Sequence, residues 1–196
     1  MAKLRVEFLK IHCKEATSGP GADEIYFAAF PTLLRKKDDG SVERRVLKGA
    51  LSNIQTDVRE GTVYTPTLTS GTSGVDIDTE DAQTVALALW MYEEDDGAHY
   101  KKLRLDPAVG NASVPRSDWG KIEDYIPEDP SSWLSWAKAA YKLLKKLLGN
   151  WLTDDLIGTR LVEVRVALPS QGDYRELTFK GDGGEYKFSL RVTKAS

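Results

Sequence analysis

Residues 85–97 read VALALWMYEEDDG, an apolar run followed by four consecutive acids. A second stretch, residues 153–158, reads TDDLIG and places two more carboxylates directly before apolar residues. A β-sandwich can build a calcium site from such stretches, because Ca²⁺ takes about six to eight oxygen ligands and the ends of neighbouring strands can deliver them together. The two stretches therefore predict a mainly β fold with carboxylates gathered at one end.

Residues 79–92 fit either a strand or a helix. The residues TEDAQ at 79–83 are typical of a helix start, and Ala82, Val85 and Leu89 would share one helical face. The strand interpretation is favoured, because the run ends in acids and negative charge at a helix C-terminus opposes the helix dipole.

Apolar–polar alternation predicts further strands. Leu4, Val6 and Phe8 alternate, and the alternation then changes parity through residues 9–13, which predicts a bulge near Phe8. Residues 25–30, IYFAAF, are apolar on both faces and predict a central strand. The other predicted strands are residues 42–47, 63–68, 159–168, 174–179 and 186–192, with turns at residues 39–40 and 181–184.

One helix interrupts the strands. Asp129 and Pro130 are typical of a helix N-terminus, and Gly149 of its end, so a helix is predicted over residues 131–148. The expected organisation is a single domain: residues 1–97 form the first part of a β-sandwich, residues 98–153 a helical insertion, and residues 154–196 the last strands of the same sandwich.

The predicted helix is basic and amphipathic. It could lie on an anionic membrane, dock on a partner protein, or pack its apolar face on the sandwich with its lysines in water. The candidate membrane or partner contacts are Trp133, Trp136, Lys138, Lys142, Lys145 and Lys146.

Composition excludes several classes of function. The chain has 196 residues and a net charge of −3, so it carries no overall basic signature of nucleic-acid binding. Its one cysteine, Cys13, cannot form an internal disulfide, and the charged N-terminus has no signal-peptide pattern. A cytoplasmic location is expected, with export without a signal peptide as the alternative. Common catalytic motifs are absent, and His12 and Cys13 would face opposite sides of a strand, so no enzymatic activity is expected.

The acidic motifs resemble those of C2 domains, the eight-stranded β-sandwiches that bind calcium and phospholipid. Residues 23–26, DEIY, resemble the Asp-Pro-Tyr of that family, with Glu24 in place of the proline. Residues 92–95, YEED, resemble its Asp-x-Asp, and residues 155–158, DLIG, its Asp-Phe-x-Gly. Thr17 stands where the family has an acid in its first loop.

The resemblance implies an eight-stranded antiparallel C2-like β-sandwich with an inserted amphipathic helix. It also implies calcium as a cofactor and attachment to anionic phospholipid membranes, although a metal-free rim of solvated acids fits the same residues. The alternative function is metal-independent protein interaction or structural assembly through the insertion, and a membrane-active toxin or effector is the third. The candidate metal ligands are Asp23, Glu93, Asp95, Asp154 and Asp155.

Overall fold

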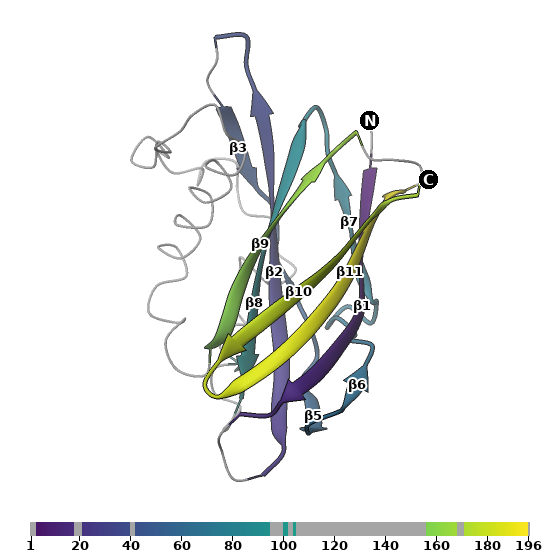
Figure 1. The fold of residues 1–196 in the computed structure, drawn as a ribbon. Coiled ribbons are helices and arrows are strands. Elements are labelled where there is room, and N and C mark those ends of the chain that lie inside the picture. The colour runs from purple at the N-terminus through teal and green to yellow at the C-terminus, as the bar shows by residue number, and fades with distance from the viewer. Residues whose placement is uncertain are drawn as a thin grey trace.

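The computed structural model describes residues 3–17, 21–39, 42–94, 100–101, 104, 156–167 and 171–195. The strands in these residues form two antiparallel sheets, one of five strands and one of six, that pack as a sandwich (Figure 1). They are β1 (Lys3–Glu15), β2 (Asp23–Lys36), β3 (Val42–Val46), β4 (Ala50–Leu51), β5 (Gln55–Val58), β6 (Val63–Tyr64), β7 (Gly74–Asp78), β8 (Thr84–Glu93), β9 (Leu156–Arg165), β10 (Asp173–Gly181) and β11 (Gly184–Ala195).

The first sheet joins the two ends of the chain. Its order is β10-β11-β1-β6, and β7 also pairs with β1. The second sheet has the order β3-β2-β8-β9, with β4 and β5 also pairing with β2. The mainly β sandwich expected from the sequence is therefore confirmed.

The predicted bulge in the first strand is confirmed. The pairing of β1 with β11 shifts between Phe8 and Lys10. Leu4, Val6 and Phe8 are buried before the shift, and Ile11 and Cys13 are buried after it. The extra residue at the bulge changes the parity, which keeps apolar side chains on the inward face of a strand of 13 residues.

Two neighbouring strands of the second sheet are buried on both faces. Every residue of β8 is buried, as is nearly every residue of β2, and the two pair antiparallel along their lengths. This confirms the predicted central strand at residues 25–30 and the strand interpretation of residues 84–92. The inward residues join the core between the sheets, while the outward residues form a second, aromatic cluster that includes Tyr26, Phe30, Trp90 and Tyr92.

The region between residues 49 and 82 differs from the prediction. The sequence predicts one short strand there, at residues 63–68, and about eight strands in the chain. The described residues contain eleven strands, because four brief ones, β4 to β7, form in this region. Two of these have two residues each, too few for apolar alternation to reveal them.

The predicted helical insertion, residues 98–153, lies outside the described residues except for Tyr100, Lys101 and Arg104. The strands on either side of it, β8 and β9, are direct partners in the second sheet. The chain therefore returns to the same sheet after the insertion. Within the part of the chain that the structure describes, no helix is long and apolar enough to cross a membrane.

The hairpin of β10 and β11 closes one side of the sandwich. Asp182 and Gly183 both have positive φ, which is the conformation of the tight turn predicted at residues 181–184. The backbone of Gly181, next to this turn, approaches the carbonyl group of Ile157 in β9 so closely that a Cβ atom would overlap with it. Because Gly181 has no side chain, the edges of the two sheets can come into contact at this position.

We expect Gly181→Ala to lower the free energy of unfolding by about 1–3 kcal/mol, because the methyl group overpacks a contact between two backbones. Gly158→Ala is the matched control: its Cβ would meet ordinary contacts, the nearest at 3.5 Å, so the effect should stay within about 0.5 kcal/mol. Urea denaturation of the two variants measures the difference. Equal midpoints would contradict this account of the edge.

Candidate functional site

Four strand ends meet at one end of the sandwich. The last residues of β1 and β8 and the first residues of β2 and β9 lie there, since Ile25 pairs with Glu93 and Tyr92 pairs with Leu156. The β10–β11 turn is at the same end, where Glu15 pairs with Glu185. Two of the predicted metal ligands, Asp23 and Glu93, are therefore brought to a common end of the second sheet.

Asp23 is buried and is held by donors from the protein. Its Oδ2 accepts a hydrogen bond from the backbone N–H of Thr17, and its Oδ1 accepts one from the Thr17 hydroxyl, both at 2.9 Å. The hydroxyl of Tyr186 also donates to Oδ2. Because a carboxylate has about four acceptor positions, most of its capacity is already used. Asp23 thus ties the end of β1 and the strand β11 to the start of β2.

A small polar cluster surrounds this carboxylate. Burial raises the pKa of the Tyr186 phenol, and its hydrogen bond to Asp23 raises it further, so the phenol stays protonated and remains a donor. The buried thiol of Cys13 lies within hydrogen-bond reach of the Tyr186 hydroxyl, and burial raises the pKa of this thiol. Burial likewise raises the pKa of Tyr64, whose hydroxyl has no hydrogen-bond partner among the described residues. The Asp23 carboxylate therefore accepts a hydrogen bond from a phenol that stays protonated, and the thiol beside this phenol stays neutral.

Glutamates occupy both faces of the β2–β8 pair at this end. By strand alternation Glu93 shares the inward face with Met91, whereas Glu94 shares the outward face with Tyr92. The backbone N–H of Glu94 donates to the carbonyl oxygen of Glu24 at 2.9 Å, which continues the ladder beyond the Ile25–Glu93 pair and sets these two glutamates opposite each other. Like charges in directly opposite positions are unfavourable unless something neutralises them.

Glu94 is an acid at this end that is not among the metal ligands predicted from the sequence. It is buried, and its Oε2 accepts a hydrogen bond from the backbone N–H of Tyr100 at 2.7 Å. Its Oε1 is also buried and has no hydrogen-bond partner among the described residues. Strand alternation could have indicated Glu94 as a buried acid. Residues two positions apart in a strand share a face, so the second glutamate after Tyr92 lies on the same buried aromatic face as Tyr92.

The remaining predicted site residues are not described. Asp95, Asp154 and Asp155, and the six helix residues Trp133, Trp136, Lys138, Lys142, Lys145 and Lys146, lie outside the described residues. Within the described ranges, no group of three or more His, Cys, Asp or Glu side chains is placed to hold a metal ion. The predicted calcium site thus stays a prediction, because three of its five ligands are not described.

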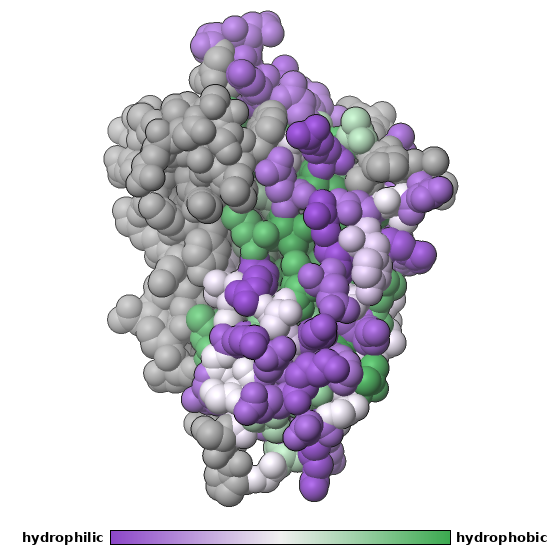
Figure 2. Space-filling model, in the orientation of Figure 1, coloured by the Kyte–Doolittle hydropathy of each residue, from purple (hydrophilic) through white to green (hydrophobic). Residues whose placement is uncertain are grey.

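The outer surface of the first sheet has a different character. Figure 2 shows a predominantly hydrophilic face where β10 and β11 lie. Cross-strand ion pairs contribute to it, including Arg191 with Glu7 at 2.7 Å and Lys187 with Glu176 at 3.1 Å. These pairs are largely exposed, and such pairs contribute little to stability.

Comparison with solved structures finds a match to a C2A domain of a plant extended synaptotagmin. The match covers 100% of this chain and 96% of that domain, at 7% sequence identity and a TM-score of 0.37. No family model and no curated protein matches the chain. The strand pairing within the two sheets is the evidence for the sandwich architecture.

The contacts of Asp23 predict a large effect of a small change. We expect Tyr186→Phe to lower the free energy of unfolding by about 1.5–3 kcal/mol, the usual contribution of a hydrogen bond to a charged group. Tyr174→Phe removes the same atom from a side chain that is 56% exposed, so it should change stability by less than about 0.5 kcal/mol. Thermal and urea unfolding of both variants give the comparison, and equal losses would refute the proposed tie between the sheets.

The raised pKa of Tyr186 also predicts a pH dependence. Above the usual tyrosine pKa of about 10, the unfolded chain loses the phenolic proton while the native state keeps it. The stabilisation is therefore complete below pH ~10 and decreases as the pH rises, by about 1.4 kcal/mol per pH unit for this group. Unfolding free energies measured from pH 8 to 11 should fall less steeply in Tyr186→Phe than in the wild type. Parallel curves would show that Tyr186 ionises normally.

Proposed function

We propose that this protein is a C2-like binding module that attaches to anionic membrane surfaces when calcium binds at its acidic end. The observation that carries the proposal is the pair of opposed glutamates, Glu24 and Glu94, with a buried Glu94 oxygen that lacks a partner among the described residues. Charge of one sign, gathered from two strands and incompletely satisfied by the protein, is the arrangement that a hard cation stabilises.

Calcium fits the chemistry of this end better than a softer metal does. The acids offer only oxygen ligands, and Ca²⁺ accepts carboxylates in flexible geometries. We propose Glu24 and Glu94 as ligands, together with Glu93, Asp95, Asp154 and Asp155, which the sequence predicts. Asp23 is proposed mainly as the anchor of the adjacent loop, because three protein donors already contact its oxygens.

Tyr100, the first described residue of the insertion, contacts this end. Tyr100 donates from its backbone to Glu94, and its hydroxyl donates to the carbonyl oxygen of Ser52 at 3.1 Å. Its ring packs edge-on against Tyr26, with the centroids 5.1 Å apart. A cation that engages Glu94 would therefore act on the first residues of the segment that carries the basic helix proposed to contact lipid. Two weak signals, a metal bridge and a basic amphipathic helix, together give firmer membrane attachment than either alone.

Metal-independent protein interaction is the second candidate function. The observation in its favour is that Asp23, the ligand that the C2 resemblance places first, is satisfied by Thr17 and Tyr186 without any metal. In this case the sandwich is a scaffold, and the insertion docks on a partner protein.

Thermal unfolding with calcium or with EDTA separates the two functions. If calcium binds only the native state, calcium at a hundred times the Kd should raise stability by about 2.7 kcal/mol, which is about 5–11 °C in Tm for a chain of this size. Binding to vesicles containing an anionic phospholipid should appear with calcium and disappear with EDTA. No shift in Tm at millimolar calcium would exclude the calcium site.

The variants must separate ligands from structural acids. Asp95→Asn with Asp155→Asn should abolish the calcium-induced shift while leaving the Tm in EDTA unchanged. Asp23→Asn is unsuitable as a ligand test, because an amide in place of its carboxylate would destabilise the fold even without calcium. Asp76→Asn is the matched control, since Asp76 is an exposed carboxylate on β7 that pairs with Arg5. An unchanged calcium response in the double variant would overturn the ligand assignment.

A further inference from the structure

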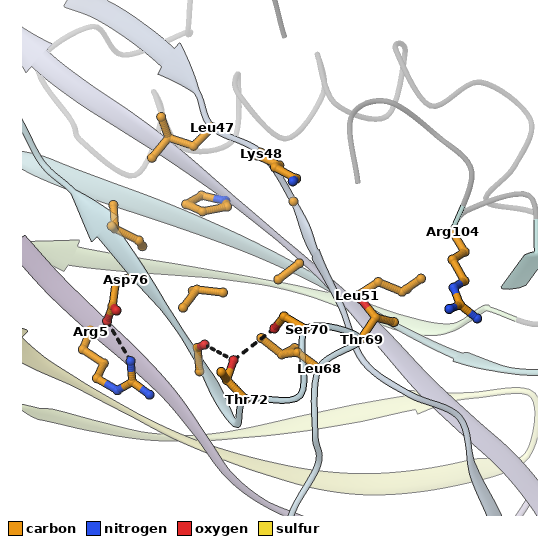
Figure 3. Close-up of a pocket in the computed structure, with 16 residues that line it drawn as sticks. Arg5, Leu47, Lys48, Leu51, Leu68, Thr69, Ser70, Thr72, Asp76 and Arg104 are labelled. Carbon is orange, nitrogen blue, oxygen red and sulfur yellow. Dashed lines mark hydrogen bonds and ion pairs between the residues drawn. The ribbon is translucent and has the colours of Figure 1, made fainter. Parts of the chain in front are cut away.

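The strand β7 (Gly74–Asp78) lies at an edge of the first sheet, beside a cleft of about 870 Å³. Among the described strands, β7 pairs with β1 alone. Residues 74–77 line the cleft from the first sheet, and residues 47–51, which lead into and form β4, line it from the second sheet (Figure 3). The cleft therefore lies between an edge of each sheet.

The backbone of β7 points alternately toward β1 and away from it. The N–H of Phe8 donates to the carbonyl oxygen of Ser73 at 2.8 Å, which sets the phase of the hydrogen bonds in this ladder. In an antiparallel ladder, residue pairs that exchange backbone hydrogen bonds alternate with pairs that do not. Val75 and Ile77 therefore bond to β1, whereas the N–H and C=O groups of Asp76, between them, point away from β1.

Gly74 agrees with this phase. It lies two residues before Asp76, and its carbonyl oxygen accepts a hydrogen bond from the hydroxyl of Thr72 at 2.8 Å. The described residues offer no hydrogen-bond partner to the outward N–H and C=O of Asp76. Unpaired backbone groups on an edge strand are a template for the addition of another strand.

The side chains of β7 alternate between two environments. Ile77 is buried and Val75 is partly buried, and both pack on the core between the sheets. Asp76 lies on the outer surface, where its side chain is 59% exposed and pairs with Arg5 of β1 at 2.8 Å. Residues directly opposite each other in neighbouring strands share a face. A strand added beside β7 would therefore place alternate side chains in the cleft and on the outer surface.

The charge of Asp76 selects the outward residue of such a strand. Opposite charges in directly opposite positions stabilise a pair of strands, and like charges destabilise it. A lysine or arginine would continue the cross-strand row that Arg5 and Asp76 begin, and the exposed Asp78, two residues on, repeats the preference. The same rule disfavours a second copy of this chain, because Asp76 would lie opposite its own copy in the full-length antiparallel register of two β7 strands.

We propose that the outward edge of β7 binds an extended segment of a partner protein in which basic and aliphatic residues alternate. The segment would continue the first sheet and exchange two backbone hydrogen bonds with Asp76. A basic residue would lie opposite Asp76, and its aliphatic neighbours would enter the cleft beside Val75 and Leu47. In this mode of recognition, backbone hydrogen bonds supply affinity and alternate side chains supply specificity. The edge pairs with the first half of β1, away from the acidic end, and requires no calcium.

Hydrogen exchange tests the edge before any ligand is added. In the full-length protein in EDTA, the amide of Asp76 should exchange at least ~10-fold faster than the amides of Val75 and Ile77, relative to their intrinsic rates, because only these two are bonded to β1. An Asp76 amide as well protected as its neighbours would show that the edge is already paired, and would overturn the proposal.

The probe is the peptide acetyl-Lys-Val-Lys-Val-Ser-amide, titrated into isotope-labelled protein in EDTA and followed by NMR. It should shift the amide resonances of residues 74–78 and slow the exchange of the Asp76 amide. The peptide with glutamate in place of both lysines should bind at least about fivefold more weakly, because attraction across the strands becomes repulsion. Absence of binding up to millimolar peptide, or equal affinity for the acidic peptide, would overturn the proposal.

A methylated peptide tests the strand pairing itself. A methyl group on the backbone nitrogen of the central lysine removes the donor to the carbonyl oxygen of Asp76 and leaves every side chain in place. Binding should weaken at least about fivefold, within the usual range for one hydrogen bond. Equal affinity of the two peptides would show that they bind through their side chains alone, and would refute the strand addition.

Two variants of one residue locate the contact on the protein. Asp76→Pro removes the outward N–H, and proline is tolerated on an edge strand where the N–H faces solvent, so the variant should keep its Tm and lose peptide binding. Asp76→Asn is the matched control, because it removes the charge and keeps the N–H, so binding should weaken only up to about fivefold. Wild-type affinity in a folded Asp76→Pro variant would refute the location. If that variant does not fold, the methylated peptide still decides on the wild type.

A final comparison separates this edge from the proposed calcium site and from self-association. Asp95→Asn with Asp155→Asn should leave peptide binding unchanged, so a failure of the calcium proposal would not affect this result. Sedimentation should show that peptide binding does not depend on protein concentration. A dimer that dissociates as the peptide binds would identify a second copy as the occupant of the edge, and would overturn the choice of partner.

Discussion

The antiparallel ladder between β2 and β8 is the constraint on which the rest of the structure depends. It runs from the Ile25–Glu93 pair to the Leu34–Thr84 pair, with apolar side chains buried on both faces. The first sheet covers the inward face, and the outward face carries its own aromatic cluster. Where the ladder ends, the same alternation places Glu93 inward and Glu94 outward. A slip of one residue would exchange the two faces, so the register that builds the core also sets the direction of each acid.

The parts of the fold that could be predicted are those encoded by local alternation. The two-faced apolar strand and the parity change at Phe8 each involve a few consecutive residues, so the sequence alone indicates them. The brief strands between residues 49 and 82 depend on a few backbone pairs each, and backbone pairing leaves no pattern in side-chain polarity. The contact between Asp23 and Tyr186 joins residues 163 positions apart, which no local signal reveals.

Asp23 shows why residue type alone did not decide the role of a site residue. Asp23 belongs to one of several acidic motifs, and a carboxylate in such a motif can serve as a metal ligand. The resemblance to C2 domains favoured that role. The structure surrounds it with hydrogen-bond donors, two of them from Thr17, and its role as a metal ligand stays a prediction. A threonine where the family has an acid changes the local chemistry: two acids would repel and need a cation, whereas one acid and one hydroxyl satisfy each other. Among the described acids at this end, the buried carboxylate oxygen without a hydrogen-bond partner therefore belongs to Glu94.

The acidic end would attract an anionic lipid only conditionally. In the proposed function, the carboxylates at this end repel an anionic headgroup until a divalent cation reverses the local charge, so attachment there would depend on calcium. The hydrogen bonds that hold Asp23 do not depend on a cation, because Thr17 and Tyr186 supply the donors. The end of the sandwich thus combines an anchor that the protein satisfies by itself with a buried Glu94 oxygen that has no hydrogen-bond partner among the described residues.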